Sequence, residues 1–342
     1  MCRILTRVRW FLCGVLAMIA CGDDSHPPMP DANPLEQWTV VSANDTTDGA
    51  LTSVWSTGND MFVTGGKGLV GMSGGGVILH YDGAHWDRTP TAQFMWWTFG
   101  FSKANVWAVG QGGSIEHYDG NAWTQTAAPS GFTGTLSGIW GAAPNDVWAV
   151  GGSADAPPVP TVLHWNGSQW SSVSSGTTES GQIFKIWGAD ASHVYAVGDR
   201  GIVLTFDGNA WTQAPRATSG QLVTDCGTAA NDVWAVGGMQ NAAVLHYDGS
   251  QWTPLQDTGL LPPLLGCTVA ADGTLLVVGR QGFIAWRNAG GWHPVDPMPT
   301  VDCLHNVALY AGGYVAVGGN LLSPASGLHG VMVRSGSALL PP

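Results

Sequence analysis

Short apolar runs recur along this chain, and each one ends in a glycine. Seven such runs, all variants of the phrase VWAVG, close at Gly65, Gly110, Gly151, Gly198, Gly237, Gly279 and Gly318. The steps between these glycines are 45, 41, 47, 39, 42 and 39 residues. The runs are apolar at consecutive positions, a pattern typical of strands that are buried on both faces. The pattern therefore predicts seven repeated units, each with a buried strand.

A second repeated phrase follows the apolar runs and contains a turn. Its copies HYDGAHW, HYDGNAW, HWNGSQW, TFDGNAW, HYDGSQW and WRNAGGW end at Trp86, Trp123, Trp170, Trp211, Trp252 and Trp292. Asp-Gly or Asn-Gly between two runs rich in Val, Ile, Trp and Tyr supplies the positive backbone angles of a tight β-hairpin. The two runs on either side of this turn are therefore predicted to pair.

One complete unit shows the predicted order of four strands. LSGIWG (residues 136–141) and DVWAVG (146–151) give the first two strands, and TVLHW (161–165) and SQWSSV (168–173) give the other two. Repeats of about 40 to 50 residues are typical of propeller blades and of helical arrays. With 49 Gly and 20 Pro in 342 residues, amphipathic helices have little room outside the N-terminus. We therefore predict an all-β fold, a seven-bladed β-propeller of four-stranded antiparallel blades over residues 36–342.

The two ends of the repeat array predict how the ring closes. EQWTVVS (residues 36–42) matches a fourth strand and precedes the first complete unit. The last unit has YVAVG and GVMVR as second and third strands, followed only by SALLPP, whose prolines would cut a strand short. We expect residues 38–42 to pair beside residues 330–334, with Trp38 in the place that Trp252 holds in its own blade. The alternative is that residues 337–340 fill this edge.

The N-terminus carries an export signal. A positive leader, MCRILTRVR, precedes an apolar core of 11 residues, WFLCGVLAMIA, which is too short to span a bilayer and indicates a signal peptide over residues 1–20. Met18-Ile19-Ala20-Cys21 resembles a bacterial lipobox, which implies cleavage before Cys21 and acylation of its thiol. An ordinary secretory signal with an incidental cysteine is the alternative. Residues 21–35 then form a lipidated, Pro-rich tether that anchors the protein to the bacterial cell envelope, at the outer membrane or cell surface.

The charge balance limits the partners. Without the first 20 residues, nine Lys and Arg remain against 24 Asp and Glu, so the mature chain is about 15 charges negative. No basic stripe exists that could neutralise phosphates, so nucleic acid is excluded as an expected partner. We predict a monomer that touches the membrane only through its lipid anchor.

Aromatic residues and cysteines recur at matching places in the units. The tryptophans are predicted to form the core between blades, with carbohydrate stacking as the alternative: Trp55, Trp97, Trp140 and Trp187 in first strands, and Trp107, Trp148 and Trp234 in second strands. After the signal and Cys21 are set aside, Cys226, Cys267 and Cys303 remain near the first strands of blades five, six and seven. They are expected to be small core residues, with a disulfide between two of them as the alternative.

Two motifs resemble chemical sites without meeting the requirements of those sites. GKGLVG (residues 66–71) matches the dinucleotide glycine pattern, but the strand VILHY follows where a helix is required. His80, His117, His164 and His246 recur in third strands, but each belongs to a different blade, so hydrogen bonding is expected rather than a shared metal ion. We predict no catalytic residue, metal or cofactor.

Units of four strands that end in DGxxW resemble bacterial propeller repeats grouped with Asp-box and tryptophan-aspartate repeat proteins. The resemblance covers residues 38–340 and concerns architecture. Asp-box turns have one residue between Asp and Gly, whereas HYDGSQW has the two adjacent. Sialidase activity is therefore not implied, and no catalytic residue is carried over.

Departures from the repeat indicate where a ligand binds. The connections between second and third strands are long at residues 66–76, 152–160 and 319–330, and in propellers these connections share one rim. Lys67, Asp155 and His329 are the polar candidates there, with tolerated insertions as the alternative.

We predict a non-catalytic binding module for a protein, glycan or envelope component. The alternative is a lyase or hydrolase with a metal-assisted site at the central channel. Acids and histidines that converge on one channel mouth would favour the enzyme, whereas the first strands offer mainly Trp, Ile, Leu and Cys.

Overall fold

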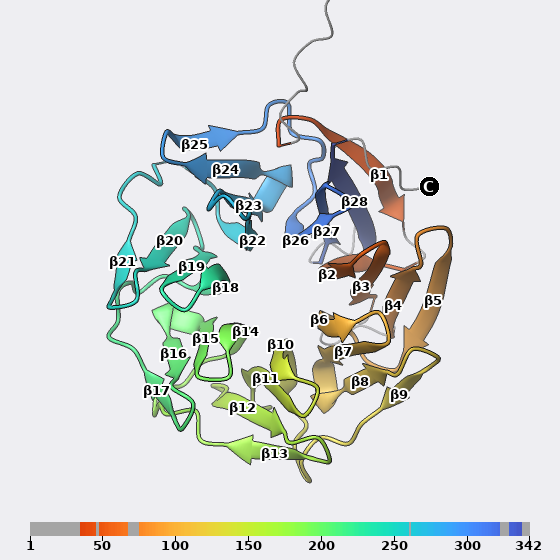
Figure 1. Ribbon diagram of the computed structural model, residues 1–342, viewed down its shortest axis with the longest axis vertical. Helices are drawn as coiled ribbons and strands as arrows, with labels where there is room; N and C mark the ends of the chain where they lie inside the picture. Colours follow the sequence, from red (N-terminus) through yellow and green to blue (C-terminus); the bar gives the residue numbers. More distant parts are fainter. Residues whose placement is uncertain (1–34, 46–47, 68–74, 260, 322–327, 337–342) are drawn as a thin grey trace, which may run out of the picture. The chain divides into compact units, whose positions relative to one another are not determined.

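Four-stranded sheets arranged around a central axis make up the fold (Figure 1). The computed structural model describes residues 35–45, 48–67, 75–259, 261–321 and 328–336. Over this part of the chain, seven antiparallel sheets account for all 28 strands, and the helical residues are three single 3-10 turns. The predicted all-β, seven-bladed propeller is therefore confirmed. The predicted signal peptide, Cys21 and most of the tether lie outside the described residues.

The first four blades follow chain order from the innermost strand outward. Blade one is β2 (Ala50–Thr57), β3 (Asp60–Gly66), β4 (Gly76–Tyr81) and β5 (Trp86–Thr91). Blade two is β6 (Met95–Ser102), β7 (Asn105–Gly110), β8 (Ile115–Tyr118) and β9 (Trp123–Gln125). Blade three is β10 (Thr135–Ala143), β11 (Asp146–Gly152), β12 (Pro160–Trp165) and β13 (Trp170–Val173). Blade four is β14 (Ile183–Asp190), β15 (His193–Gly198), β16 (Val203–Phe206) and β17 (Trp211–Gln213).

The remaining blades keep this order, except that blade seven takes its outer strand from the start of the chain. Blade five is β18 (Leu222–Ala229), β19 (Asp232–Gly237), β20 (Ala243–Tyr247) and β21 (Trp252–Pro254). Blade six is β22 (Leu264–Val269), β23 (Leu275–Gly279), β24 (Ile284–Asn288) and β25 (Gly291–Pro294). Blade seven is β26 (Leu304–Tyr310), β27 (Gly313–Asn320), β28 (His329–Ser335) and β1 (Trp38–Asp45). The 3-10 turns are η1 (Gln111–Gly113), η2 (Asp199–Gly201) and η3 (Arg280–Gly282).

Strand β1 closes the ring as predicted. It pairs antiparallel with β28, and Trp38 lies opposite Ser335 at the end of that strand. Trp252 lies opposite Tyr247 in the same way, so the two tryptophans occupy equivalent places. The indole N–H of Trp38 donates to the Leu35 carbonyl at 3.0 Å, and its ring packs against the core of blades six and seven. Residues 337–340, the alternative closing segment, lie outside the described residues.

The Asp-Gly turns have the predicted positive backbone angles. Gly83, Gly120, Gly167, Gly208 and Gly249 have φ between +90° and +97°. In each turn the preceding Asp or Asn side chain accepts two backbone N–H groups, as Asp119 does from Asn121 and Ala122. A Cβ on Gly120 would lie 2.8 Å from the Cβ of Ala104 in the turn between the first and second strands. Glycine is therefore required both by the turn and by the turn packed beside it.

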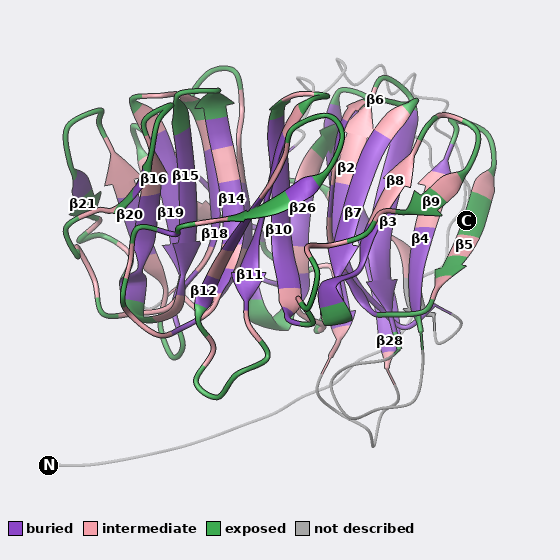
Figure 2. Cartoon of the chain, turned by 90° about the horizontal axis from the view of Figure 1, so that it is seen from below, coloured by how far each residue is buried: buried purple, intermediate pink, exposed green. Residues whose placement is uncertain are grey.

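Aromatic side chains join each blade to the next, as the tryptophan pattern predicts. The tryptophan at the start of a fourth strand packs edge to face against the aromatic side chain in the second strand of the preceding blade. The ring centroids lie 5.6 Å apart for Trp170 and Trp107, 5.5 Å for Trp211 and Trp148, and 5.9 Å for Trp252 and Tyr195. These aromatics belong to the buried core, and Figure 2 shows that exposed residues concentrate in outer strands and loops.

First-strand tryptophans also pack on the next blade. A Cβ on Gly188 would lie 2.6 Å from the Trp140 ring, so the glycine makes room for this indole. Trp97 does not share this register: Phe99 lies opposite Trp107, as Trp140 lies opposite Trp148. Trp97 is partly buried and still packs against the core cluster between blades two and three, so its predicted core role is confirmed at a position two residues earlier in the strand.

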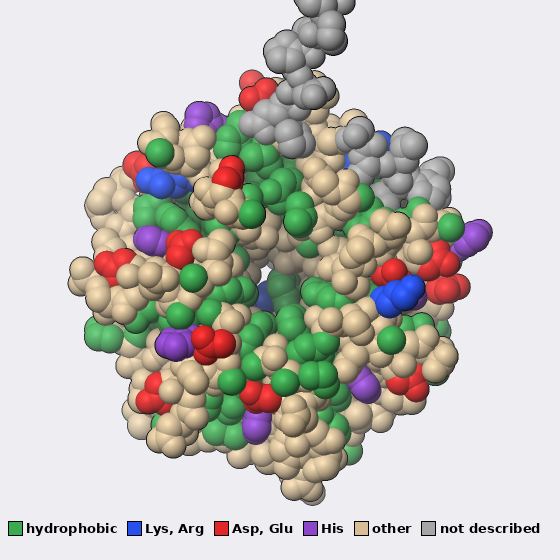
Figure 3. Space-filling model, in the orientation of Figure 1, with side chains coloured by type: hydrophobic (Ala, Val, Ile, Leu, Met, Phe, Trp, Pro, Cys, Tyr) green, Lys and Arg blue, Asp and Glu red, His purple; other side chains and the backbone are tan. Residues whose placement is uncertain are grey.

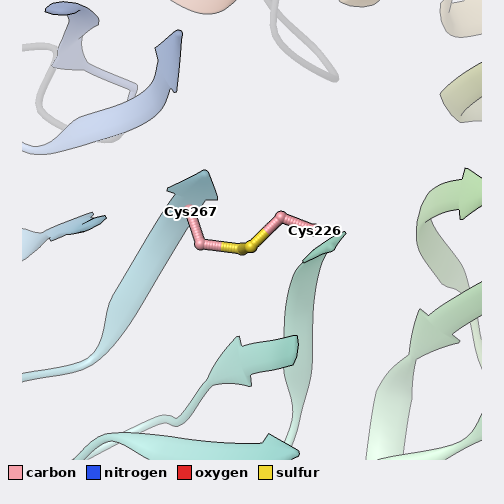
Figure 4. Close-up of a disulfide and its surroundings, with 2 residues drawn as sticks. All are labelled: Cys226 and Cys267. Carbon is pink, nitrogen blue, oxygen red and sulfur yellow. A yellow bond between two sulfur atoms is a disulfide. The ribbon is translucent and has the colours of Figure 1, made fainter. Parts of the chain in front are cut away.

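Two of the three cysteines form a disulfide (Figure 4). Cys226 and Cys267 are bonded between the innermost strands of blades five and six, with Cα atoms 6.0 Å apart. Cys226 lies opposite Trp234, the place that Trp140 holds opposite Trp148, so the disulfide replaces an aromatic contact between blades. Cys303 carries a free thiol. The disulfide alternative is therefore confirmed for this pair, and both cysteines are also buried.

The recurrent histidines have the structural role that the sequence predicts. Each ring stacks on the cross-strand aromatic of the second strand, as His164 does on Trp148 at 4.1 Å. Each Nε2 also forms a hydrogen bond with the side chain of the first residue of the second strand. The partners of His80, His117, His164 and His246 are Asp60, Asn105, Asp146 and Asp232, at 2.7–3.0 Å. The histidines thus join the second strand to the third through side-chain contacts.

Candidate functional site

The three predicted ligand residues lie at the end of the ring where second strands lead into third strands. Lys67 is exposed, and its backbone N–H donates to the Gly75 carbonyl at 3.0 Å. Asp155 is exposed in the connection of blade three. His329 is buried, and its Nε2 lies 2.9 Å from the Asp302 carboxylate. The binding role of these three residues stays a prediction.

A cavity of about 720 Å³ lies at the same end of the ring, where the innermost strands begin. Every innermost strand has a register shift after its first or second residue, which leaves one bulged residue out of the ladder. The seven bulged residues all line the cavity: Thr52, Trp96, Ser137, Phe184, Val223, Leu265 and His305. We call these seven residues the bulge ring.

The cavity and the predicted loops share one face for a topological reason. Successive strands of each blade alternate in direction, so the connections into first and third strands lie at one end of the ring. Arg280 lies in the connection into β24 and Asn320 ends β27, whereas Gln182, Gln221 and Asp302 precede first strands, and all five line the cavity. Of the predicted residues, His329 contacts this wall through Asp302.

Lys185 is the buried cation of the cavity wall. It directly follows the bulge of β14, and its side chain crosses toward blades two and three. Nζ donates to the Ser137 carbonyl at 2.9 Å and lies 4.0 Å from the centre of the Trp97 ring. Burial lowers the Lys185 pKa to about 7, although the nearby Asp225 carboxylate acts in the opposite direction. An ammonium group is therefore easily deprotonated here.

Asp225 and His305 are two further titratable groups near this lysine. Burial raises the pKa of Asp225 well above its usual range, while backbone N–H groups and Lys185 oppose the rise. Burial, with a smaller contribution from the Lys185 charge, lowers the pKa of His305 to about 4, while the hydrogen bond to the Gly319 carbonyl acts in the opposite direction. Nε2 of His305 lies 3.4 Å from the Gly319 carbonyl, so that nitrogen carries the proton and Nδ1 is the acceptor. At neutral pH the imidazole is uncharged.

The sequence interpretation missed these three residues. It described first strands as offering mainly Trp, Ile, Leu and Cys, whereas Lys185, Asp225 and His305 all lie on first strands. The signal that could have found them is an alignment of first strands on their first Leu, Ile or Met. Such an alignment places His305 in the bulge ring and Lys185 one residue after it, a position where the other blades have uncharged residues.

Several exposed apolar side chains surround the cavity on the same face. Val159 and Met239 lie in connections into third strands, and Met298 and Val301 lie in the connection that leads into β26. Val301 is 86% exposed and lines the cavity, and Met239 is 68% exposed. The Met239 carbonyl accepts a hydrogen bond from the Arg280 guanidinium at 3.4 Å. We call Met239 and Val301 the apolar rim.

The centre of the ring is hollow, and hydrophobic side chains gather around the opening on the face that Figure 3 draws. Across the described residues, no group of three His, Cys, Asp or Glu side chains is placed to hold a metal ion. In the same part of the chain, no helix is long and apolar enough to cross a membrane.

The fold is shared with solved structures of low sequence identity. YCF48 from Cyanidioschyzon merolae is 14% identical with a TM-score of 0.64, over 87% of this chain and 98% of that one. YCF48 bound to D1 peptide is 14% identical with a TM-score of 0.66, over 91% and 99%. A catalytically inactive virginiamycin B lyase from Staphylococcus aureus with quinupristin is 8% identical with a TM-score of 0.63, over 87% and 99%.

At these identities the likeness establishes the propeller fold alone. No protein-family model and no curated protein sequence matches the chain.

Proposed function

We propose that this propeller is a binding module that captures a protein segment on the face that carries the cavity. The observation that carries the proposal is the apolar rim beside a mostly apolar cavity of about 720 Å³. Exposed apolar groups next to a concave apolar site are typical of recognition surfaces. The partner segment lies against Met239 and Val301 at the mouth of the cavity.

The similar structures support a protein partner over a glycan. One of them is YCF48 bound to D1 peptide, which is a propeller with a peptide ligand. Sugar recognition uses exposed aromatic faces, whereas most of the repeated aromatics here are packed between blades.

The tether is the second part of the proposal. A lipid on Cys21 would hold the propeller at the cell envelope, with residues 22–34 as spacer. A disulfide between Cys226 and Cys267 suits an exported protein, because disulfides persist in oxidising compartments. Radiolabelled palmitate fed to a bacterial host should enter the wild-type chain and not Cys21→Ser. Equal labelling of the two chains would contradict the anchor.

The protein-binding proposal is tested with charges on opposite faces of the ring. Met239→Glu with Val301→Glu places two carboxylates on the apolar rim, and Leu309→Glu is the matched control, since Leu309 is 59% exposed at the other end of a first strand. Envelope proteins crosslinked to the anchored wild type should be recovered with the control and lost with the rim variant. Equal recovery with both variants would overturn the proposal.

A second candidate function is favoured by three titratable groups in or near the cavity wall. Lys185, Asp225 and His305 bring an amine, an acid and a neutral imidazole to one region, as the predicted alternative of an enzyme requires. A structurally similar propeller is a lyase. The test compares the turnover of candidate substrates by the mature chain with their turnover by the Lys185→Met variant.

A further inference from the structure

The chain uses lysine at three positions, and one of them is in the cavity wall. Lys67 and Lys103 are exposed at the surface, whereas Lys185 is 8% exposed. A buried lysine is destabilising unless it is paired or neutral, because the ammonium group loses its hydration. The position therefore calls for an explanation other than solubility.

We propose that Lys185 binds a small apolar aldehyde or ketone covalently, as a reversible imine inside the cavity. Lys185 is one of the residues that line the cavity, so a ligand that enters lies beside this side chain. The Ser137 carbonyl and the Trp97 ring hold this nitrogen in place. This inference concerns the interior of the ring and does not depend on the binding of a protein at the rim.

The state of the amine suits this chemistry. A lysine is a nucleophile only in its neutral form, and desolvation in an apolar pocket is one way in which proteins activate it. With its pKa near 7, about half of Lys185 is neutral at pH 7. A lysine with an ordinary pKa of about 10.4 is neutral in roughly one molecule in 2,500 at this pH.

The reaction balances without an added reactant. The Nζ lone pair attacks the carbonyl carbon, and a proton moves from nitrogen to the former carbonyl oxygen to give a carbinolamine. Loss of that oxygen as water, with the second proton of the amine, leaves the C=N bond. Addition of water reverses the sequence and releases the carbonyl compound.

Neighbouring groups can move the protons that these steps require. Nδ1 of His305 is the acceptor nitrogen of a neutral imidazole on the cavity wall. Burial raises the pKa of Asp225 well above its usual range, which favours the protonated form of this carboxyl. The other charged groups on the wall are already engaged: Arg280 with the Met239 carbonyl, and Asp302 with His329.

The remaining wall defines the class of ligand. The bulge ring supplies Trp96, Phe184, Val223 and Leu265, so most of the surface near Lys185 is apolar. A cavity of about 720 Å³ lies within the usual range of small-molecule sites. Apolar walls also limit water, which would otherwise hydrolyse the imine. The expected ligand is an aliphatic or aromatic carbonyl compound without a large charged group.

The test is reductive alkylation of the mature chain, made soluble by Cys21→Ser. The protein is treated at pH 7 with butanal and cyanoborohydride, which reduces an imine to a stable secondary amine, and peptide mapping gives the rate at each lysine. Lys185 should be alkylated at least about tenfold faster than Lys67 and Lys103, since its neutral fraction is up to about a thousandfold larger. Equal or slower reaction at Lys185 would overturn the inference.

Two further measurements tie the reaction to the folded cavity. In the unfolded chain the three lysines should react at similar rates, because the pKa shift requires burial. Val223→Trp fills the cavity with an indole and should slow alkylation of Lys185 at least about fivefold, while Lys67 and Lys103 react as before. If Lys185 reacts undiminished in a folded Val223→Trp chain, the carbonyl does not enter through the cavity and the proposal is wrong.

Discussion

The second strands and the bulge ring are built by the same repeat, yet they differ in how much the sequence varies. Five of the second strands are variants of one phrase: DMFVTG, NVWAVG, DVWAVG, HVYAVG and DVWAVG. The seven residues of the bulge ring are all different: Thr52, Trp96, Ser137, Phe184, Val223, Leu265 and His305. Both regions lie in strands at the same place of every blade.

The difference follows from what each side chain contacts. A second-strand residue such as Trp148 is packed by its own blade and by the next, so its size and shape are fixed on all sides. A bulged residue lines the cavity on one side, although Thr52 and Ser137 also hydrogen-bond to residues in or beside the neighbouring blade. Repetition therefore marks the packing between blades, and variation marks the surface that is free to recognise a ligand.

Loss of the closing strand should have the largest effect on the ring. Deleting residues 22–44 removes β1 and leaves the edge of β28 unpaired and open to other chains. We expect the melting temperature to fall by about 10 °C or more, with aggregation, in differential scanning calorimetry and light scattering. Deleting residues 22–34 alone keeps Leu35 and Trp38 and should melt like the mature chain. Equal melting of the two truncated chains would contradict closure by β1.

Paired alanine substitutions sharpen the contrast between the two regions. Trp148→Ala removes a buried indole between blades three and four and should lower the free energy of unfolding by about 3–5 kcal/mol. Phe184→Ala removes a bulge-ring side chain and should lower it by less than about 1 kcal/mol. Urea titration measures both values. Similar losses would mean that the bulge ring is as tightly packed as the blades.

Removing the disulfide should give the next largest loss of stability, because the bond replaces an aromatic contact between the innermost strands. Cys226 and Cys267 enclose 41 residues, for which chain entropy predicts a stabilisation of about 4 kcal/mol, and measured values are often about 2–4 kcal/mol. The double variant Cys226→Ser, Cys267→Ser should show this loss in urea. Unchanged stability would mean that packing holds blades five and six together without the bond.

Titration of the channel should give a smaller, pH-dependent effect. Since the pKa of Lys185 falls from 10.5 to about 7 on folding, the unfolded chain binds more protons above pH 7, and stability rises with pH. The rise should be about 2 kcal/mol between pH 7 and pH 9 and should be absent in Lys185→Met. A wild-type curve with no more rise than that of Lys185→Met would contradict a desolvated lysine.

Lowering the pH should change the contributions of His305 and Asp225 to stability in opposite directions. His305 has a folded pKa of about 4, below its usual 6.5, so its contribution to stability is lost as pH falls through this window. Asp225 has a raised pKa, so its protonated form favours folding, and its contribution is lost as pH rises from 3.8 toward that value. His305→Gln and Asp225→Asn separate the two contributions in urea titrations at pH 4 to 7.

The sequence predicts the fold further than it predicts the site, for a physical reason. Apolar periodicity, Asp-Gly turns and the ring closure at Trp38 are each set by local pattern, and the structure confirms them. The convergence of Lys185, Asp225 and His305 depends on the one-residue bulge near the start of each first strand. A bulge shifts which side chains face the channel, and pattern within one strand does not reveal it.

Site-specific photocrosslinking tests most directly the claim that this molecule binds its partner on the face that carries the cavity. A photoreactive residue placed at Val301, on the apolar rim, or at Leu309, at the opposite end of a first strand, is activated in cells that carry the anchored chain. The account predicts one discrete crosslinked species from position 301 and none from position 309. A discrete species from position 309, with none from 301, would contradict it.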